Sequence, residues 1–271
     1  MITLAVVPSV TPGDTRAALE DLCGRLSRLL DTAISGVHPE SYSELQSLLE
    51  KDRAQYAWMP PALIVLGSEK LRLEPLLSSV REDRTEYRAV VFVDAASAFR
   101  EVRDLVGKKI AWVDPASASG YLVPRLHLAS KGIDPGRLFG EELFVRSHAE
   151  VVSAVFSGRA HAGATYAHRP AQGEKIRRAG FLDAAPDREA RVLEWTQAIP
   201  SDVIAGHGLI PRAQHRLFSN ALLTLAEQDA GRQALFSVFH TDRFAITPRD
   251  ALRPLWQMVR LARQHGLLNQ L

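Results

Sequence analysis

Short apolar runs alternate with longer segments of helical periodicity through most of this 271-residue chain. Such alternation is typical of an α/β fold with mostly parallel sheets, because two parallel strands need a crossover that a helix supplies. The runs that predict strands are 3–7, 55–59, 88–93, 110–113, 143–145, 161–165 and 191–196. The segments that predict helices are 16–30, 42–51, 117–131, 149–156, 212–227, 231–239 and 250–265, with one more that starts near residue 61.

The alternation falls into two series, joined by extended segments near 91–95 and 191–198. We therefore predict two lobes, each large enough to fold around its own core. Residues 1–92 and 198–271 form the predicted first lobe, and residues 93–197 form the second.

Composition limits the classes of partner. Hydrophobic residues make up 46% of the chain and charged residues 24%, as in an ordinary globular protein, and the net charge is only +2. That charge, with no basic block, argues against nucleic acid as a partner, and no apolar stretch approaches the roughly 20 residues of a membrane helix.

Two further patterns predict burial or exposure. Cys23 falls on the apolar stripe of a predicted helix and should be a buried apolar side chain. Residues 173–188 are mixed in charge and predict a surface excursion of the second lobe.

Motifs of catalysis are missing from the sequence. It contains no phosphate-binding loop of the GxxxxGKS/T type, no HExxH and no GxSxG. His161 and His168 are seven residues apart across a strand and its exit, which is not a metal-ligand spacing. We expect no catalytic residue, no metal and no cofactor, although an enzyme on the same kind of fold remains an alternative.

Residues 110–122, IAWVDPASASGYL, combine a strand with a hydroxyl-rich turn that opens a helix. The first N–H groups of a helix have no partner inside the helix and lie at the positive end of its dipole, so they bind anions. Ser117 and Ser119 could add hydroxyl donors there, or either could be only an N-cap. Spacing alone leaves these two readings open.

Four blocks of sequence resemble the phosphate/phosphite/phosphonate-binding proteins of ABC transporters. They are VDPASASGYLVP (113–124), KGIDP (131–135), SHAEVVSAVFSG (147–158) and AHAGATY (160–166). Further similar blocks lie at 41–49, 56–61, 87–93 and 196–206. The resemblance covers most of residues 2–208, and the serine turn is its most specific part.

This resemblance implies a bilobal clamp of the type 2 periplasmic-binding-protein fold. Such a clamp has two mixed, mostly parallel sheets flanked by helices and a two-strand hinge, with a ligand cleft between the lobes that hinge closure shuts. The implied function is to bind a small phosphorus oxyanion for ABC-type uptake, as a monomer, with the transporter's membrane subunits as partners if the chain is exported. The first strand starts at once, with no leader before it. We expect a periplasmic or lipid-anchored protein if a leader was removed from this sequence, and a cytoplasmic protein if none was. A cytoplasmic ligand-sensing protein on the same fold is the main alternative.

The resemblance also implies site residues. Ser147 and Glu150 have the spacing of a capping box, which places His148 in the first turn of a helix. A histidine there can donate a ring N–H to an anion, and a bound dianion would favour its protonated form. The positions that match ligand-binding positions of the family are Tyr42, Tyr87, Ser117, Ala118, Ser119, His148 and Asp202.

Two departures from the family pattern bear on the ligand. Ala118 stands where the family commonly has threonine, which removes one hydroxyl donor. Aminophosphonate binders place an acid near the end of the strand at 161–165, but here no acid follows until Glu174. Both changes count against aminoethylphosphonate and leave a simpler oxyanion, or an unrelated ligand, open.

Overall fold

The computed structural model describes residues 1–7, 12–65, 72–81, 83–170 and 174–264. The chain divides into two compact units, with boundaries after Thr85, Ile199 and Arg253. The first unit contains residues 1–85 and 200–253, and the second contains 86–199 and the described residues from 254 onward. These boundaries are not the predicted ones after 92 and 197, and the C-terminal helix α10 (Arg253–Gln264) groups with the second unit. Within that unit Gln197 Nε2 donates a hydrogen bond of 2.8 Å to Met258 Sδ of α10.

The first unit contains a six-stranded mixed sheet with the strand order β11-β4-β10-β3-β1-β2. Its strands are β1 (Ile2–Val6), β2 (Ile34–Val37), β3 (Tyr56–Met59), β4 (Leu73–Val80), β10 (Val203–His207) and β11 (Arg243–Ile246). β1 pairs in parallel with β2 and β3, while the pairs β3–β10, β10–β4 and β4–β11 are antiparallel. The parallel half agrees with the predicted alternation, although β2 itself was missed. The antiparallel half depends on β4, β10 and β11, three strands that the sequence analysis does not predict.

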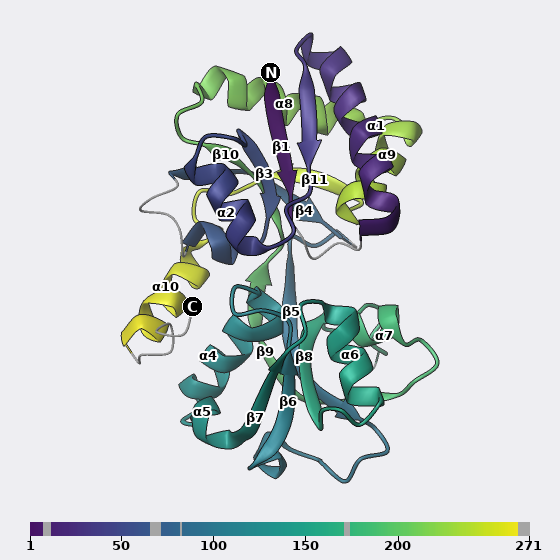
Figure 1. The fold of residues 1–271 in the computed structure, drawn as a ribbon, viewed down its shortest axis with the longest axis vertical. Coiled ribbons are helices and arrows are strands. Elements are labelled where there is room, and N and C mark those ends of the chain that lie inside the picture. The colour runs from purple at the N-terminus through teal and green to yellow at the C-terminus, as the bar shows by residue number, and fades with distance from the viewer. Residues whose placement is uncertain (8–11, 66–71, 82, 171–173, 265–271) are drawn as a thin grey trace. The chain divides into compact units, whose positions relative to one another are not determined.

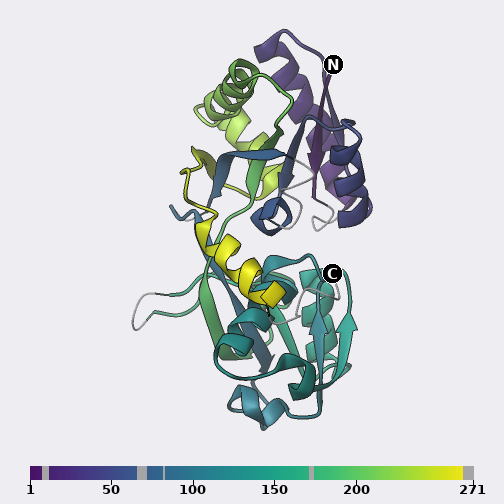
Figure 2. The ribbon, with the colours of Figure 1, turned by 90° about the vertical axis from the view of Figure 1, so that its left-hand side faces the viewer.

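Helices cover both faces of this sheet. They are α1 (Pro12–Leu30), α2 (Tyr42–Glu50), α8 (Arg212–Leu225) and α9 (Asp229–Phe239). α1 lies beside α9, and α2 lies on the opposite side of the sheet from α8 and α9 (Figures 1 and 2). Cys23 of α1 is 2% exposed, as predicted, and burial raises the pKa of its thiol to about 11, so the thiol is unreactive at neutral pH.

The second unit contains a five-stranded sheet with the order β7-β6-β8-β5-β9. Its strands are β5 (Glu86–Asp94), β6 (Lys108–Trp112), β7 (Phe139–Phe144), β8 (Ala162–Ala167) and β9 (Ala190–Pro200). β6 pairs in parallel with β7 and β8, and β5 runs antiparallel to β8. Its helices, besides α10, are η1 (Val102–Leu105), η2 (Ala118–Leu122), α4 (Val123–Ser130), α5 (Pro135–Leu138), α6 (His148–Phe156) and α7 (Gly180–Ala184).

Both faces of the second sheet are buried. Val90 and Phe92 of β5 face a core that includes α6 and α7, while Val91 and Val93 face a core that includes η2, α4 and α5 (Figure 1). Successive strand residues point to opposite faces, so a sheet covered on both sides needs continuous apolar strands. That requirement explains why β5 and β6 could be predicted from short apolar runs.

The predicted surface excursion at 173–188 is wrong for part of its length; residue 173 lies outside the described residues. Ala179 and Phe181 are buried at 0% and 3% exposure, and α7 packs against α6. Ala179 and Phe181 lie among charged residues, and so short an apolar pattern does not identify a core segment. Tertiary contacts decide whether such a segment is buried.

None of the described helices has the length and apolar character needed to cross a bilayer.

Replacing Phe181 by alanine tests this correction. A buried phenylalanine cut to alanine costs about 3–5 kcal/mol of unfolding free energy, so F181A should destabilise the protein by that order in urea unfolding. R177A, at an exposed position two residues before the buried segment, should change the free energy by less than about 0.5 kcal/mol. If F181A and R177A both changed the unfolding free energy by less than about 0.5 kcal/mol, the prediction that this segment lies at the surface would be supported.

Candidate functional site

One edge of the second sheet gathers five of the seven predicted site residues. β6 is parallel to β7 and β8, so the carboxyl ends of the three strands lie at the same edge, where ligands bind in open α/β sheets. Residues 117–119 follow β6, and His148 follows β7. β5 starts at this edge, since Arg88 lies opposite Ala167 at the end of β8. Tyr87, half-buried, precedes Arg88 and therefore lies there too.

The serine turn after β6 is built on Asp114. Its side chain accepts a hydrogen bond from Ala116 N (2.8 Å), and its carbonyl accepts one from Ser117 N (2.9 Å). Ser117 is then the N-cap, with its Oγ accepting from Gly120 N at 3.1 Å. An N-cap hydroxyl that accepts in this way still has its own proton to donate outward.

The helix after the turn does not start as the regular α-helix that was predicted. Residues 118–122 form a π-helical turn, in which Leu122 N donates to Ser117 O at 2.9 Å, and α4 follows from Val123. Pro124 supplies a physical reason. In an α-helix residue 124 would donate to the carbonyl of Gly120, but proline has no N–H. π-Helical turns occur frequently at functional sites.

The freed Gly120 carbonyl has another partner. Val113 N donates to it at 3.2 Å, so the turn folds back onto the end of β6. The close approach requires glycine, because a Cβ at position 120 would collide with the Val113 side chain. Val113 O in turn accepts from Arg146 N at 2.8 Å, in the segment that leads to His148.

The two serines of the turn have different roles. Ser117 is 4% exposed and caps the helix, which settles the N-cap reading for that residue. Ser119 is 3% exposed, and no hydrogen bond of its hydroxyl is found among the described residues. Ala118, 2% exposed, has only its backbone N–H to offer. Among the described residues the Ser119 hydroxyl is therefore uncommitted, whereas the Ser117 hydroxyl already accepts one hydrogen bond and has only its proton left to donate.

A second helix start at this edge carries His148. Ser147 Oγ caps α6 by accepting from Glu150 N at 3.1 Å, as the capping-box spacing predicts. Arg146 turns the chain from β7 into α6 with φ = 73°, a left-handed conformation that is unusual for a residue other than glycine. Such strained positions cluster at functional sites.

The His148 ring has a defined environment. Its Nδ1 lies 2.9 Å from Thr165 Oγ1, and the Tyr166 ring meets it edge to face at 4.9 Å between centroids. Burial lowers the pKa of the half-buried imidazole to about 4. In the ligand-free protein the ring is therefore neutral at pH 7, and the protonated form expected beside a dianion is not its resting state.

The other two predicted residues belong to the first unit. Tyr42 is the first residue of α2, 8% exposed, behind Ser41, which caps that helix. Asp202 lies between β9 and β10, with its carboxylate 3.4 Å from Arg81 NH2. Burial raises the pKa of Asp202, and Arg81 opposes that rise. The ligand roles of Tyr42 and Asp202 stay predictions.

Three residues of interest were missed from the sequence. Thr165 contacts His148, and Arg81 pairs with Asp202 while donating to two carbonyls at the end of α9, Phe239 O (3.1 Å) and His240 O (2.7 Å). Asp183 of α7 accepts from Tyr166 OH at 2.5 Å, so an acid does reach the end of β8, from a segment beyond Glu174. Only folding brings these partners together, and no local pattern marks them.

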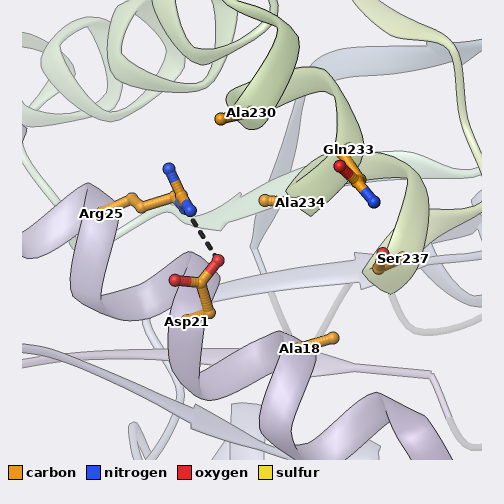
Figure 3. Close-up of a pocket in the computed structure, with 7 residues that line it drawn as sticks. All are labelled: Ala18, Asp21, Arg25, Ala230, Gln233, Ala234 and Ser237. Atoms are coloured by element: carbon orange, nitrogen blue, oxygen red, sulfur yellow. Dashed lines mark hydrogen bonds and ion pairs between the residues drawn. The ribbon is translucent and has the colours of Figure 1, made fainter.

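A pocket of about 240 Å³ lies elsewhere in the first unit, between α1 and α9 (Figure 3). It is lined by Ala18, Asp21, Arg25, Ala230, Gln233, Ala234 and Ser237. Its two charged side chains pair with each other, Arg25 Nε to Asp21 Oδ2 at 2.7 Å, and none of the predicted site residues lines the pocket.

The described residues contain no group of three or more His, Cys, Asp or Glu placed to hold a metal ion.

The family can now be assigned from the whole chain. Residues 4–251 match the family model described as ABC transporter, phosphonate, periplasmic substrate-binding protein. The chain belongs to this family. A curated relative, the phosphate-import protein PhnD of Mycolicibacterium smegmatis, is 25% identical over 136 residues. That match covers 49% of this chain and 42% of the relative, so it spans less than half of the relative's length.

Solved structures share the fold at low sequence identity. The binding component of an ABC phosphonate transporter from Pseudomonas aeruginosa superposes with a TM-score of 0.81 at 16% identity, over 99% of this chain and 88% of that one. PhnD1 from Prochlorococcus marinus, in complex with methylphosphonate, gives 0.76 at 15% identity, over 97% and 98%. The protein XAC2383 from Xanthomonas citri, bound to ATP, gives 0.78 at 19% identity, again over 97% and 98%. These likenesses confirm the α/β fold with two mixed sheets.

Gly120 provides a test of how the serine turn is built. In this phosphonate-family protein G120A should lose about 1–3 kcal/mol of unfolding free energy, because the added methyl group overpacks against Val113. G24A is the matched control: its Cβ would meet only Arg28 NH1 at 3.9 Å, inside α1, and should stabilise the protein by about 0.5–1 kcal/mol. Urea unfolding of both variants gives the comparison. A stabilising G120A would contradict the close approach.

The pKa of His148 provides a second test. Its ring should titrate near pH 4 in the native ligand-free protein and near 6.5 in urea. The unfolded chain then binds a proton first, so the stability contributed by the neutral ring is complete above about pH 6.5 and is lost as pH falls toward 4. NMR titration of the histidine ring protons, with H148Q to assign the signal, measures it. A native midpoint near 6.5 would contradict the burial argument.

Proposed function

We propose that this protein is the solute-binding component of an ABC-type uptake system and that its ligand is a small phosphorus oxyanion. The observation that carries the proposal is the serine turn at the edge of the second sheet. There, two buried serines and the first N–H groups of the η2–α4 helix lie in a chain whose sequence matches the phosphonate-binding family.

The chemistry of the turn suits an oxyanion. A phosphorus oxyanion offers several oxygens that accept hydrogen bonds. The turn offers donors: the hydroxyls of Ser117 and Ser119, and backbone N–H groups at the start of the helix for which the described residues provide no acceptor. Hydrogen bonds to a charged acceptor are worth roughly twice as much as neutral ones, so a few of them can hold an anion without a lysine. His148, from the second helix start, is the proposed further donor.

The remaining contacts rest on the family resemblance. Tyr87 lies at the same edge as the turn, and Tyr42 and Asp202 are proposed to contact the ligand from the first lobe. Because Ala118 lacks a hydroxyl and Asp183 lies at the end of β8, phosphite, phosphate and alkylphosphonates are the first candidates and aminoethylphosphonate stays on the list. The named ligands of the relatives, phosphate, methylphosphonate and ATP, belong in the same screen.

We further propose that the protein works by binding alone, on the outer side of the membrane, and passes its ligand to the membrane subunits of the transporter. The description of the family as periplasmic substrate-binding proteins supports both points.

Calorimetry against phosphate, phosphite, methylphosphonate, aminoethylphosphonate, ATP and sulfate tests the proposal. For the best ligand, S119A should weaken affinity by about 10–100-fold, the value of one hydrogen bond to a charged group, without loss of stability. S117A should lose affinity and also about 1 kcal/mol of stability, because it removes the N-cap. S153A, at an exposed position on α6, is the matched control and should bind as wild type. The proposal fails if no phosphorus oxyanion binds, or if S119A binds as tightly as wild type.

A further inference from the structure

We propose that Thr165 is the positioning residue that fixes His148 in one tautomer, with the ring proton on Nε2, so that the imidazole meets the anion as a neutral N–H donor. This inference rests on the proposed function for its ligand, but its central claim concerns the ligand-free protein. It assigns a role to a strand residue that the sequence patterns do not single out.

The direction of one hydrogen bond carries the argument. Thr165 is 0% exposed, and a buried hydroxyl proton left without an acceptor costs free energy. Within the described part of the chain, the hydrogen bond of the Thr165 side chain is the one to His148 Nδ1, at 2.9 Å. If Nδ1 carried the proton, the hydroxyl would accept and its own proton would have no acceptor. The hydroxyl therefore donates to Nδ1, and the neutral ring must carry its proton on Nε2.

The ring is neutral and has little freedom to turn. Burial disfavours the charged imidazolium, as the lowered pKa of His148 indicates. The edge-to-face contact with Tyr166, at 83° between the ring planes, limits rotation of the imidazole. Tyr166 is itself held through its hydroxyl by Asp183. Nε2–H is thus a donor with a set direction.

Two glycines allow the Thr165 hydroxyl and His148 to meet. At Gly163 a Cβ would lie 2.5 Å from Val151 Cγ1, so glycine allows α6 to lie close over β8 and brings its first residue within reach of Thr165. At Gly180 a Cβ would collide with Thr165 Oγ1 itself. Because threonine is stiff at χ1, an added methyl group at position 180 should turn the hydroxyl away from His148.

The consequence for binding is a donor that needs no protonation step. An imidazolium donor would be lost as pH rises through its pKa, whereas the neutral Nε2–H donor persists at neutral and mildly alkaline pH. A ring free to switch tautomers would present a lone pair to the anion part of the time, and that form would repel it.

The experiment is long-range ¹H–¹⁵N NMR of the whole chain labelled with ¹⁵N-histidine, which distinguishes the two neutral tautomers. T165V replaces the hydroxyl with a methyl group of similar volume, and T165S keeps the hydroxyl. At pH 7, wild type and T165S should show His148 with its proton on Nε2, while T165V should show a mixture of tautomers. G180A should reproduce the T165V signal although neither partner residue is changed, and it keeps the test valid if T165V folds poorly.

Affinity for the best oxyanion of the calorimetric screen follows. If about half of the T165V rings carry the proton on Nε2, affinity should weaken by about twofold, because only that fraction presents a donor, and T165S should bind as tightly as wild type. A proton on Nδ1 in wild type, or a T165V signal identical to wild type, would overturn the inference. The tautomer is read without ligand, so a correct tautomer in a protein that binds no oxyanion would refute the proposed function and leave the positioning role of Thr165 intact.

Discussion

The backbone of Val113 holds the candidate site together. Its N–H donates to Gly120 O of the serine turn, and its carbonyl accepts from Arg146 N in the segment that leads to His148. One residue at the end of β6 thus joins the loops that follow two neighbouring strands. The spacing between the two groups of donors is set by backbone hydrogen bonds of 3.2 and 2.8 Å and not by flexible side chains.

The donors proposed for this site carry no net charge in the ligand-free protein. Hydroxyls, backbone N–H groups and a neutral imidazole replace the lysines and arginines that a surface anion site would use. Burying such groups costs less than burying cations, and fixed dipoles need no reorganisation when the anion arrives. In the first unit Asp202 and Arg81 form an ion pair, so each charge is partly compensated by the other.

Local signals explain what could be predicted from the sequence. The apolar run of β6, the hydroxyl-rich turn and the Ser147–Glu150 spacing each act within a few residues, and all three are confirmed. β4 was missed because LEPLLSSV has no regular apolar–polar alternation and contains Pro75, and proline within a run argues against a strand. Trp58 Nε1 donates to the buried Ser79 hydroxyl at 3.0 Å, and Ser78 Oγ meets Thr247 Oγ1 at 2.9 Å, 169 positions away. The role of Thr165 was out of reach because its partner comes from another element.

Pro124 changes how a stabilising mutation should be judged in this helix. A survey of helix propensities would rank alanine above proline there by about 3 kcal/mol and recommend the exchange. Alanine would, however, restore an N–H aimed at the Gly120 carbonyl and make it compete with Val113 for the same acceptor. The helix would become more regular, but the serine turn would lose its hydrogen bond to the end of β6. Local helix stability and the geometry of the candidate site are therefore opposed at this position. If the turn binds an anion as proposed, natural selection for binding and engineering for thermal stability would act here in opposite directions.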